Sequence, residues 1–114
     1  MFYFNGYGEN ALTFSADLES TKKGTPIKID TFNVAKSVSD GEDFIGVCKG
    51  VDSIKATVIM DGYVEVPYTG TEPTLNYCGL VGNATGGVKV SATAKKNYKV
   101  IKVDKEKHIV GFIL

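Results

Sequence analysis

Short runs of Val, Ile, Thr, Tyr and Phe, each closed by a turn signal, recur at roughly ten-residue spacing along this chain. The clearest example is "KATVIMDGYVEVPYTG" at residues 55–70, where two such runs meet at Asp61-Gly62. This dipeptide suits both central positions of a type I′ turn, because both positions need positive φ. The stretch therefore predicts an antiparallel hairpin between residues 55–60 and 63–68.

The residue usage points to the same fold class. Val and Ile outnumber Leu and the chain has no Gln, and β-branched side chains suit pleated strands better than helices. The 114 residues are enough for one domain with its own core. We predict an all-β fold, a small single-domain antiparallel barrel or sandwich over residues 24–114. Residues 1–23 precede it as an extended aromatic N-terminal arm or a first strand. A second hairpin should turn at residues 104–107 and end in a paired strand at 108–114.

The charged residues argue against several partners. Thirteen basic residues balance thirteen acidic ones, and every basic residue is Lys. Without Arg and without net positive charge, we expect no binding to nucleic acid. No apolar run is long enough to span a membrane and no signal peptide pattern is present, so we expect synthesis in a cytoplasm. Cys48 and Cys78 lie in apolar runs and are predicted to be buried, reduced thiols.

Motifs for catalysis or metal binding are weak. The single histidine, His108, opens an apolar run, which favours a packed or half-exposed strand residue over a catalytic base. Asp40, Glu42 and Asp43 in "SDGEDF" lack the spacing of a calcium loop and are interpreted as a solvated turn. "GYGENA" at residues 6–11 matches a dinucleotide fingerprint only in letters, because no strand and helix flank it. We predict a protein that is not an enzyme and has no cofactor or metal.

The aromatic arm is the predicted binding site. Phe2, Tyr3, Phe4 and Tyr7 lie within the first seven positions. Aromatic side chains dominate the energetics of interfaces when they are buried there. Two interpretations remain open for this segment: it forms the first strand of the domain's own sheet, or it lies across a neighbouring subunit or a capsid.

Four stretches, "GTPIKI", "FIGVC", "ATVIMDGYVEVPYTG" and "VIKVDKEKHIVGFIL", resemble a known family. The chain is similar over residues 24–114 to the small β-barrel head proteins of tailed bacteriophages, which are described as capsid decoration, stabilisation or head-fibre proteins. The shared scheme has a Gly-x-Pro strand start at Gly24, a "GV" strand at Gly46, the Asp61-Gly62 turn and an Asp-containing turn at Asp104.

The resemblance implies a non-enzymatic virion structural protein that binds the outer surface of the capsid shell and stabilises it. Its partner would be the phage major capsid protein, its location the capsid surface of the virion, and its place of synthesis the bacterial host cytoplasm. Self-association into a homo-oligomer, for example a trimer on a symmetry axis, would fit the same family. The alternative is a carbohydrate- or cell-surface-binding β-module of a phage tail or fibre. The six Tyr residues could provide stacking surfaces for sugar rings, but the chain has no Trp, which is the commonest residue for such stacking.

Overall fold

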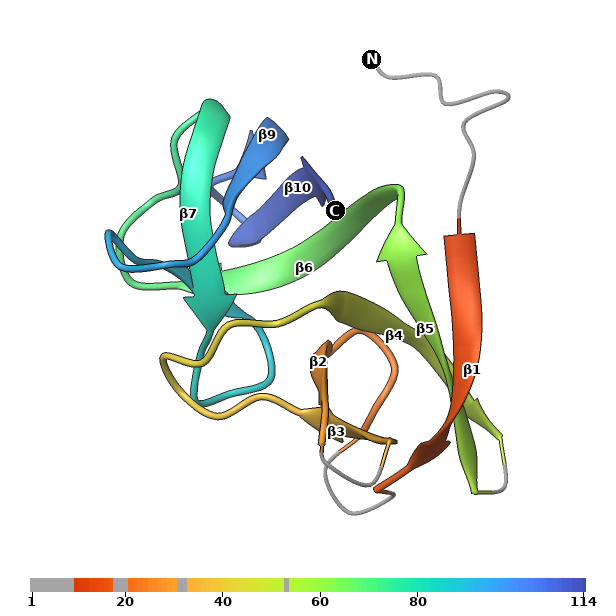
Figure 1. Ribbon diagram of the computed structural model, residues 1–114. Coiled ribbons are helices and arrows are strands. Elements are labelled where there is room, and N and C mark those ends of the chain that lie inside the picture. The colour runs from red at the N-terminus through yellow and green to blue at the C-terminus, as the bar shows by residue number, and fades with distance from the viewer. Residues whose placement is uncertain (1–9, 18–20, 31–32, 53) are drawn as a thin grey trace.

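The computed structural model of the protein describes residues 10–17, 21–30, 33–52 and 54–114. These residues form ten strands and no helix, so the prediction of an all-β fold is confirmed. The strands are arranged in two five-stranded closed barrels within one domain (Figure 1).

Barrel 1 is built from the first five strands and barrel 2 from the last five. The strands of barrel 1 are β1 (Asn10–Ala16), β2 (Pro26–Ile29), β3 (Val34–Ser37), β4 (Gly46–Asp52) and β5 (Lys55–Asp61). The strands of barrel 2 are β6 (Tyr63–Thr69), β7 (Asn76–Gly82), β8 (Val88–Val90), β9 (Asn97–Asp104) and β10 (Ile109–Ile113).

The two barrels share one topology. In barrel 1 the order is β1-β3-β2-β4-β5, and β5 returns to pair with β1. In barrel 2 the order is β6-β8-β7-β9-β10, and β10 returns to pair with β6. The first and third strands of each barrel are parallel, and every other pair is antiparallel. Five consecutive strands therefore follow the same path twice.

Strand register and bulges repeat as well. Val58 of β5 pairs with Cys48 of β4, and Phe112 of β10 pairs with Val100 of β9. In both barrels a β-bulge follows directly after this pair on the fourth strand. Val58 and Phe112 are both fully buried, and each belongs to the core of its barrel. A bulge bends its strand and increases the local twist, which helps a five-stranded sheet to close.

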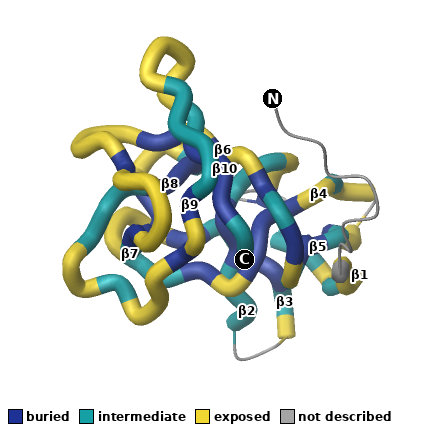
Figure 2. The backbone as a smooth tube through the Cα atoms, turned by 90° about the horizontal axis from the view of Figure 1, so that it is seen from above, coloured by how far each residue is buried: buried dark blue, intermediate teal, exposed yellow. Residues whose placement is uncertain are grey.

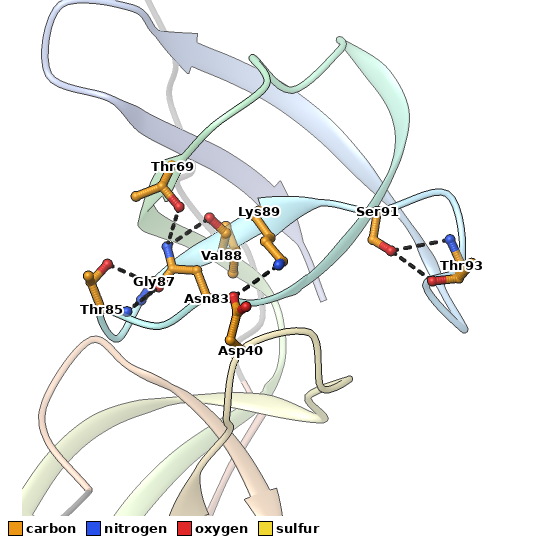
Figure 3. Close-up of polar contacts among 9 residues, drawn as sticks. All are labelled: Asp40, Thr69, Asn83, Thr85, Gly87, Val88, Lys89, Ser91 and Thr93. Carbon is orange, nitrogen blue, oxygen red and sulfur yellow. Dashed lines mark hydrogen bonds and ion pairs between the residues drawn. The ribbon is translucent and has the colours of Figure 1, made fainter.

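The connection between the second and third strands repeats in its hydrogen bonds. Asp30 Oδ1 accepts a bond of 3.0 Å from Val34 N, and Asn83 Oδ1 accepts one of 2.8 Å from Gly87 N (Figure 3). Both are side-chain caps of a turn over four residues. The fold is thus an internal structural duplication, which the sequence analysis did not predict.

The hairpin predicted at Asp61-Gly62 is wrong. β5 pairs with β1 and β4, whereas β6 pairs with β10 and β8. Gly62 does adopt the positive φ that the turn signal indicated, at 119°. The turn instead carries the chain from barrel 1 into barrel 2 (Figure 1), because β5 and β6 each find two partners within their own barrel.

The second predicted hairpin is confirmed. β9 and β10 pair around a turn at residues 105–108, and β10 lies between β9 and β6. The predicted last strand is therefore part of a barrel wall, although it begins at Ile109 and not at His108, which has a positive φ of 55°. Cys48 and Cys78 are buried and unpaired, as predicted.

The two cores differ in size. Barrel 1 encloses a small cluster of Ile27, Ala35, Cys48, Ala56 and Val58. The larger cluster fills barrel 2 and extends to Val47 of β4 and Ile59 of β5 in barrel 1. It includes four aromatic rings, Phe44, Tyr68, Tyr98 and Phe112. Phe44 comes from the loop between β3 and β4, so a loop of barrel 1 completes the core of barrel 2. Buried residues occur in the strands of both barrels (Figure 2).

Candidate functional site

The predicted binding residues Phe2, Tyr3, Phe4 and Tyr7 lie outside the residues that the structure describes. The structure places the segment that follows them. Asn10 is the first residue of β1, which lies on the side of barrel 1 that faces away from barrel 2 (Figure 1). Asn10 pairs with Asp61, the last residue of β5, so this end of β1 lies beside the Gly62 junction between the two barrels.

β1 is an exposed strand. Ala11, Leu12 and Thr13 are exposed to solvent, and the Leu12 side chain retains 52% of its accessible surface. Phe14 and Ala16 are half-buried and pack against the small core of barrel 1. Leu12 is therefore the large apolar residue of β1 that is most exposed to solvent.

A groove crosses the outer face of β1, β5 and β4. It is lined by Thr13, Lys49, Gly50, Val51, Asp52, Ile54, Lys55 and Thr57. Part of its floor follows from the bulge between Cys48 and Gly50, which breaks the regular pairing of β4 with β5. The groove adjoins the turn between these two strands, where the Ile54 side chain is 63% exposed.

The described lining residues of the groove carry three kinds of polar group. Thr13 and Thr57 bring hydroxyl groups, Lys49 and Lys55 bring ammonium groups, and Asp52 is the one carboxylate among them. All of these groups can form hydrogen bonds with a polar ligand. Among the described residues, no group of three His, Cys, Asp or Glu side chains is placed to hold a metal ion.

The acidic turn has a role that the sequence analysis did not predict. Asp40 forms an ion pair of 2.9 Å with Lys89 of barrel 2 (Figure 3). Asp43 Oδ1 accepts a hydrogen bond of 2.9 Å from the backbone N of Lys95. Two of the three carboxylates therefore join the β3–β4 loop to barrel 2, so the turn is a connection between the barrels and not merely solvated.

Glu42, the third carboxylate, fixes the loop from within barrel 1. Its carboxylate accepts hydrogen bonds from Lys28 Nζ at 2.8 and 3.0 Å and from the backbone N of Ser39 at 2.6 Å. These donors, Lys28 first, lower the pKa of Glu42 to about 2. Its backbone O accepts a bond of 2.8 Å from Gly82 N of barrel 2, so the loop that Glu42 shapes is bonded to both barrels.

His108 is a structural residue in this fold. It precedes β10, and its ring lies 5.5 Å from the ring of Tyr68 in a stacked arrangement. Its backbone O accepts a hydrogen bond of 2.9 Å from Tyr68 N. The expectation of a packed histidine therefore holds in part, since its ring stacks while the residue as a whole is exposed.

Comparison with known proteins gives no relative. No family model matches the chain, and no curated protein matches it. Among the described residues, no helix is long and apolar enough to cross a membrane.

Proposed function

We propose that this protein is a non-enzymatic virion structural protein of a tailed bacteriophage that binds the outer surface of the capsid shell and stabilises it. The observation that carries the proposal is the exposed side of barrel 1. Leu12 and Ile54 are more than half exposed there, and the aromatic arm enters the fold at β1 on the same barrel. The sequence resemblance to phage head proteins over residues 24–114 supports the same function.

The arm supplies the side chains for binding. Phe2, Tyr3, Phe4 and Tyr7 are of the types that form interface hot spots. Binding to the assembled shell, and not to its separate subunits, would stabilise the shell by mass action against the pressure of packaged DNA. Because the chain has no Arg and no net charge, this binding should depend weakly on salt.

The groove favours a second candidate function, a carbohydrate- or cell-surface-binding module. Hydroxyl, ammonium and carboxylate groups line it beside apolar side chains, which is the mixture that sugar hydroxyls and rings need. None of its described lining residues is aromatic, so these residues offer a sugar ring no stacking platform. The capsid surface therefore remains the preferred partner.

Cosedimentation separates the two candidates. The purified full chain is mixed with empty expanded heads assembled from the major capsid protein of the same genome, and in parallel with host cell-wall polysaccharide. We expect saturable binding to heads and none to polysaccharide. Saturable binding to polysaccharide that is lost in Thr57→Ala, with no binding to heads, would support the carbohydrate module instead.

A further inference from the structure

We propose that two copies of this protein associate through the outer edge of β1, by antiparallel pairing of β1 with β1 about a two-fold axis. On one side β1 pairs with β5 from Asn10 to Ser15. On its other side the described strands pair with it at Ser15 and Ala16 alone, through β3. Among the described residues, the outer edge of Asn10–Phe14 therefore has no partner strand, and this inference does not depend on what the protein binds.

The backbone groups on this edge follow from one hydrogen bond. Ala16 N donates to Ile54 O at 2.9 Å, so the N–H of Ala16 points toward β5. Because N–H groups alternate in direction along a strand, those of Phe14 and Leu12 also point toward β5. The N–H and C=O groups of Thr13 and Ala11 point to the open edge.

Barrel 2 provides an internal control, because β6 is the counterpart of β1. Leu12 of β1 pairs with Val58 of β5 in barrel 1. Val64 of β6 pairs with Phe112 of β10, the residue of barrel 2 that corresponds to Val58. The next residue, Thr13, therefore corresponds to Glu65, and Ser15 corresponds to Pro67. Tyr68 N donates toward β10, so Pro67, one position earlier, faces the outer edge without an N–H.

Charges and prolines on an outer edge are the means by which proteins prevent strand pairing between molecules. β6 has both, Glu65 and Pro67, and both are exposed. β1 reads NALTFSA and has neither a charge nor a proline. β1 and β6 thus hold the same place in the same topology but differ in how well their outer edges are protected against pairing with another strand. The exposed strand, β1, is the one without such protection.

A second copy fits this edge better than a foreign strand does. The open segment is short and uncharged, so a two-fold axis places it against itself without repulsion. With the axis at Leu12, Thr13 of one copy forms a hydrogen-bonded pair with Ala11 of the other, and Ala11 with Thr13. The two Leu12 residues then form a non-hydrogen-bonded pair, in which side chains lie closest, and each covers the exposed surface of the other.

The test measures mass and cross-linking. Light scattering of the full chain over increasing concentration should show the mass rising from 12.2 kDa toward twice that value. Thr13→Glu copies the protection of β6 and should weaken the dimer at least tenfold, with an unchanged melting temperature. Thr13→Pro removes an N–H that faces away from β5 and should act in the same way.

Cross-linking provides a second test. Leu12→Cys should form a disulfide-linked dimer on mild oxidation. Ile54→Cys should not, because Ile54 is also exposed but lies off the β1 edge.

Three results would each overturn the pairing. The first is a full chain that stays monomeric up to about 1 mM. The second is a Thr13→Glu variant that dimerises as the unaltered chain does. The third is a Leu12→Cys variant that cross-links no faster than Ile54→Cys. The full chain could instead stay monomeric and lose its binding to heads in Thr13→Glu. That result would also overturn self-pairing, because it would show that the β1 edge pairs with a strand of the capsid shell.

Discussion

The rings of Phe44 and Tyr98 stack with their centroids 5.1 Å apart and their planes within 2° of parallel, and Tyr98 Oη donates a hydrogen bond of 3.2 Å to Phe44 O. Phe44 belongs to the β3–β4 loop and Tyr98 to β9, so this pair joins the two barrels. Burial raises the pKa of the Tyr98 phenol from 10.0 to about 12, which extends the pH range in which the phenol can donate this bond into the alkaline region.

Shortening Phe44 should therefore destabilise the whole domain. Phe44→Ala removes a stacked ring from the larger core, and we expect a loss of about 3–5 kcal/mol in the free energy of unfolding. Tyr98→Phe keeps the ring but leaves Phe44 O without this donor, so its cost should be about 1 kcal/mol. Urea denaturation gives both values. Leu75→Ala, at a side chain that is 57% exposed, is the control and should change the stability by less than about 0.5 kcal/mol.

Acid should weaken the loop that joins the barrels. The folded pKa of Glu42 lies at about 2, below its unfolded value of 4.5. Its contribution to stability is therefore complete above pH 4.5 and is lost as the pH falls toward 2. The Glu42 side chain is 39% exposed, so the contribution should be below about 1 kcal/mol. Melting curves of Glu42→Gln should differ from those of the unaltered chain at pH 6, and the difference should shrink as the pH falls from 4.5 toward 2. A constant difference across this range would disprove the assignment.

Substitution of Gly62 should destabilise the junction between the barrels. Gly62 is buried and has a φ of 119°, a region that residues with a Cβ rarely adopt. We expect Gly62→Val to cost roughly 1–3 kcal/mol. Gly50→Ala is a matched control, because a Cβ there would meet nothing within 4 Å. Equal denaturation midpoints for the two variants would show that the junction tolerates a side chain.

The two thiols should resist alkylation until the domain unfolds. Cys48 is 1% and Cys78 is 5% exposed, and burial raises the pKa of the Cys48 thiol, which lowers its thiolate fraction. Iodoacetamide should therefore label neither residue at neutral pH in the native chain and both in denaturant without reductant. Mass spectrometry counts the adducts. An unlabelled chain in denaturant would reveal a disulfide.

Much of the fold could be predicted from the sequence, and the limits have physical causes. β-branched runs and turn signals are local, so they correctly indicated the all-β class and the β9–β10 hairpin. Pairing between distant strands is not local. Positive φ at Gly62 was foreseen, but the partners of β5 and β6 are set by packing within each barrel.

The duplication was hidden because equivalent positions differ in size. Val58 occupies in barrel 1 the place that Phe112 occupies in barrel 2, and Ala16 corresponds to Tyr68 by its pairing with the third strand. The strand register and the turn hydrogen bonds of barrel 1 repeat in barrel 2, whereas the amino acids at equivalent positions differ. The open edge of β1 was hidden for the same reason, since it is recognised by comparison with β6. The predicted contact residues of the arm remain predictions.

The occupancy of purified heads by the arm-deleted chain is the measurement that tests the proposed function most directly. Empty expanded heads are saturated with the full chain or with a chain lacking residues 2–7, and the bound protein is quantified after sedimentation. We predict saturable binding of the full chain and an affinity at least roughly tenfold lower, about 1.4 kcal/mol, for the deletion, with an unchanged melting temperature. A full chain that does not sediment with heads would contradict binding to the capsid, and equal occupancy by both chains would contradict the role of the arm.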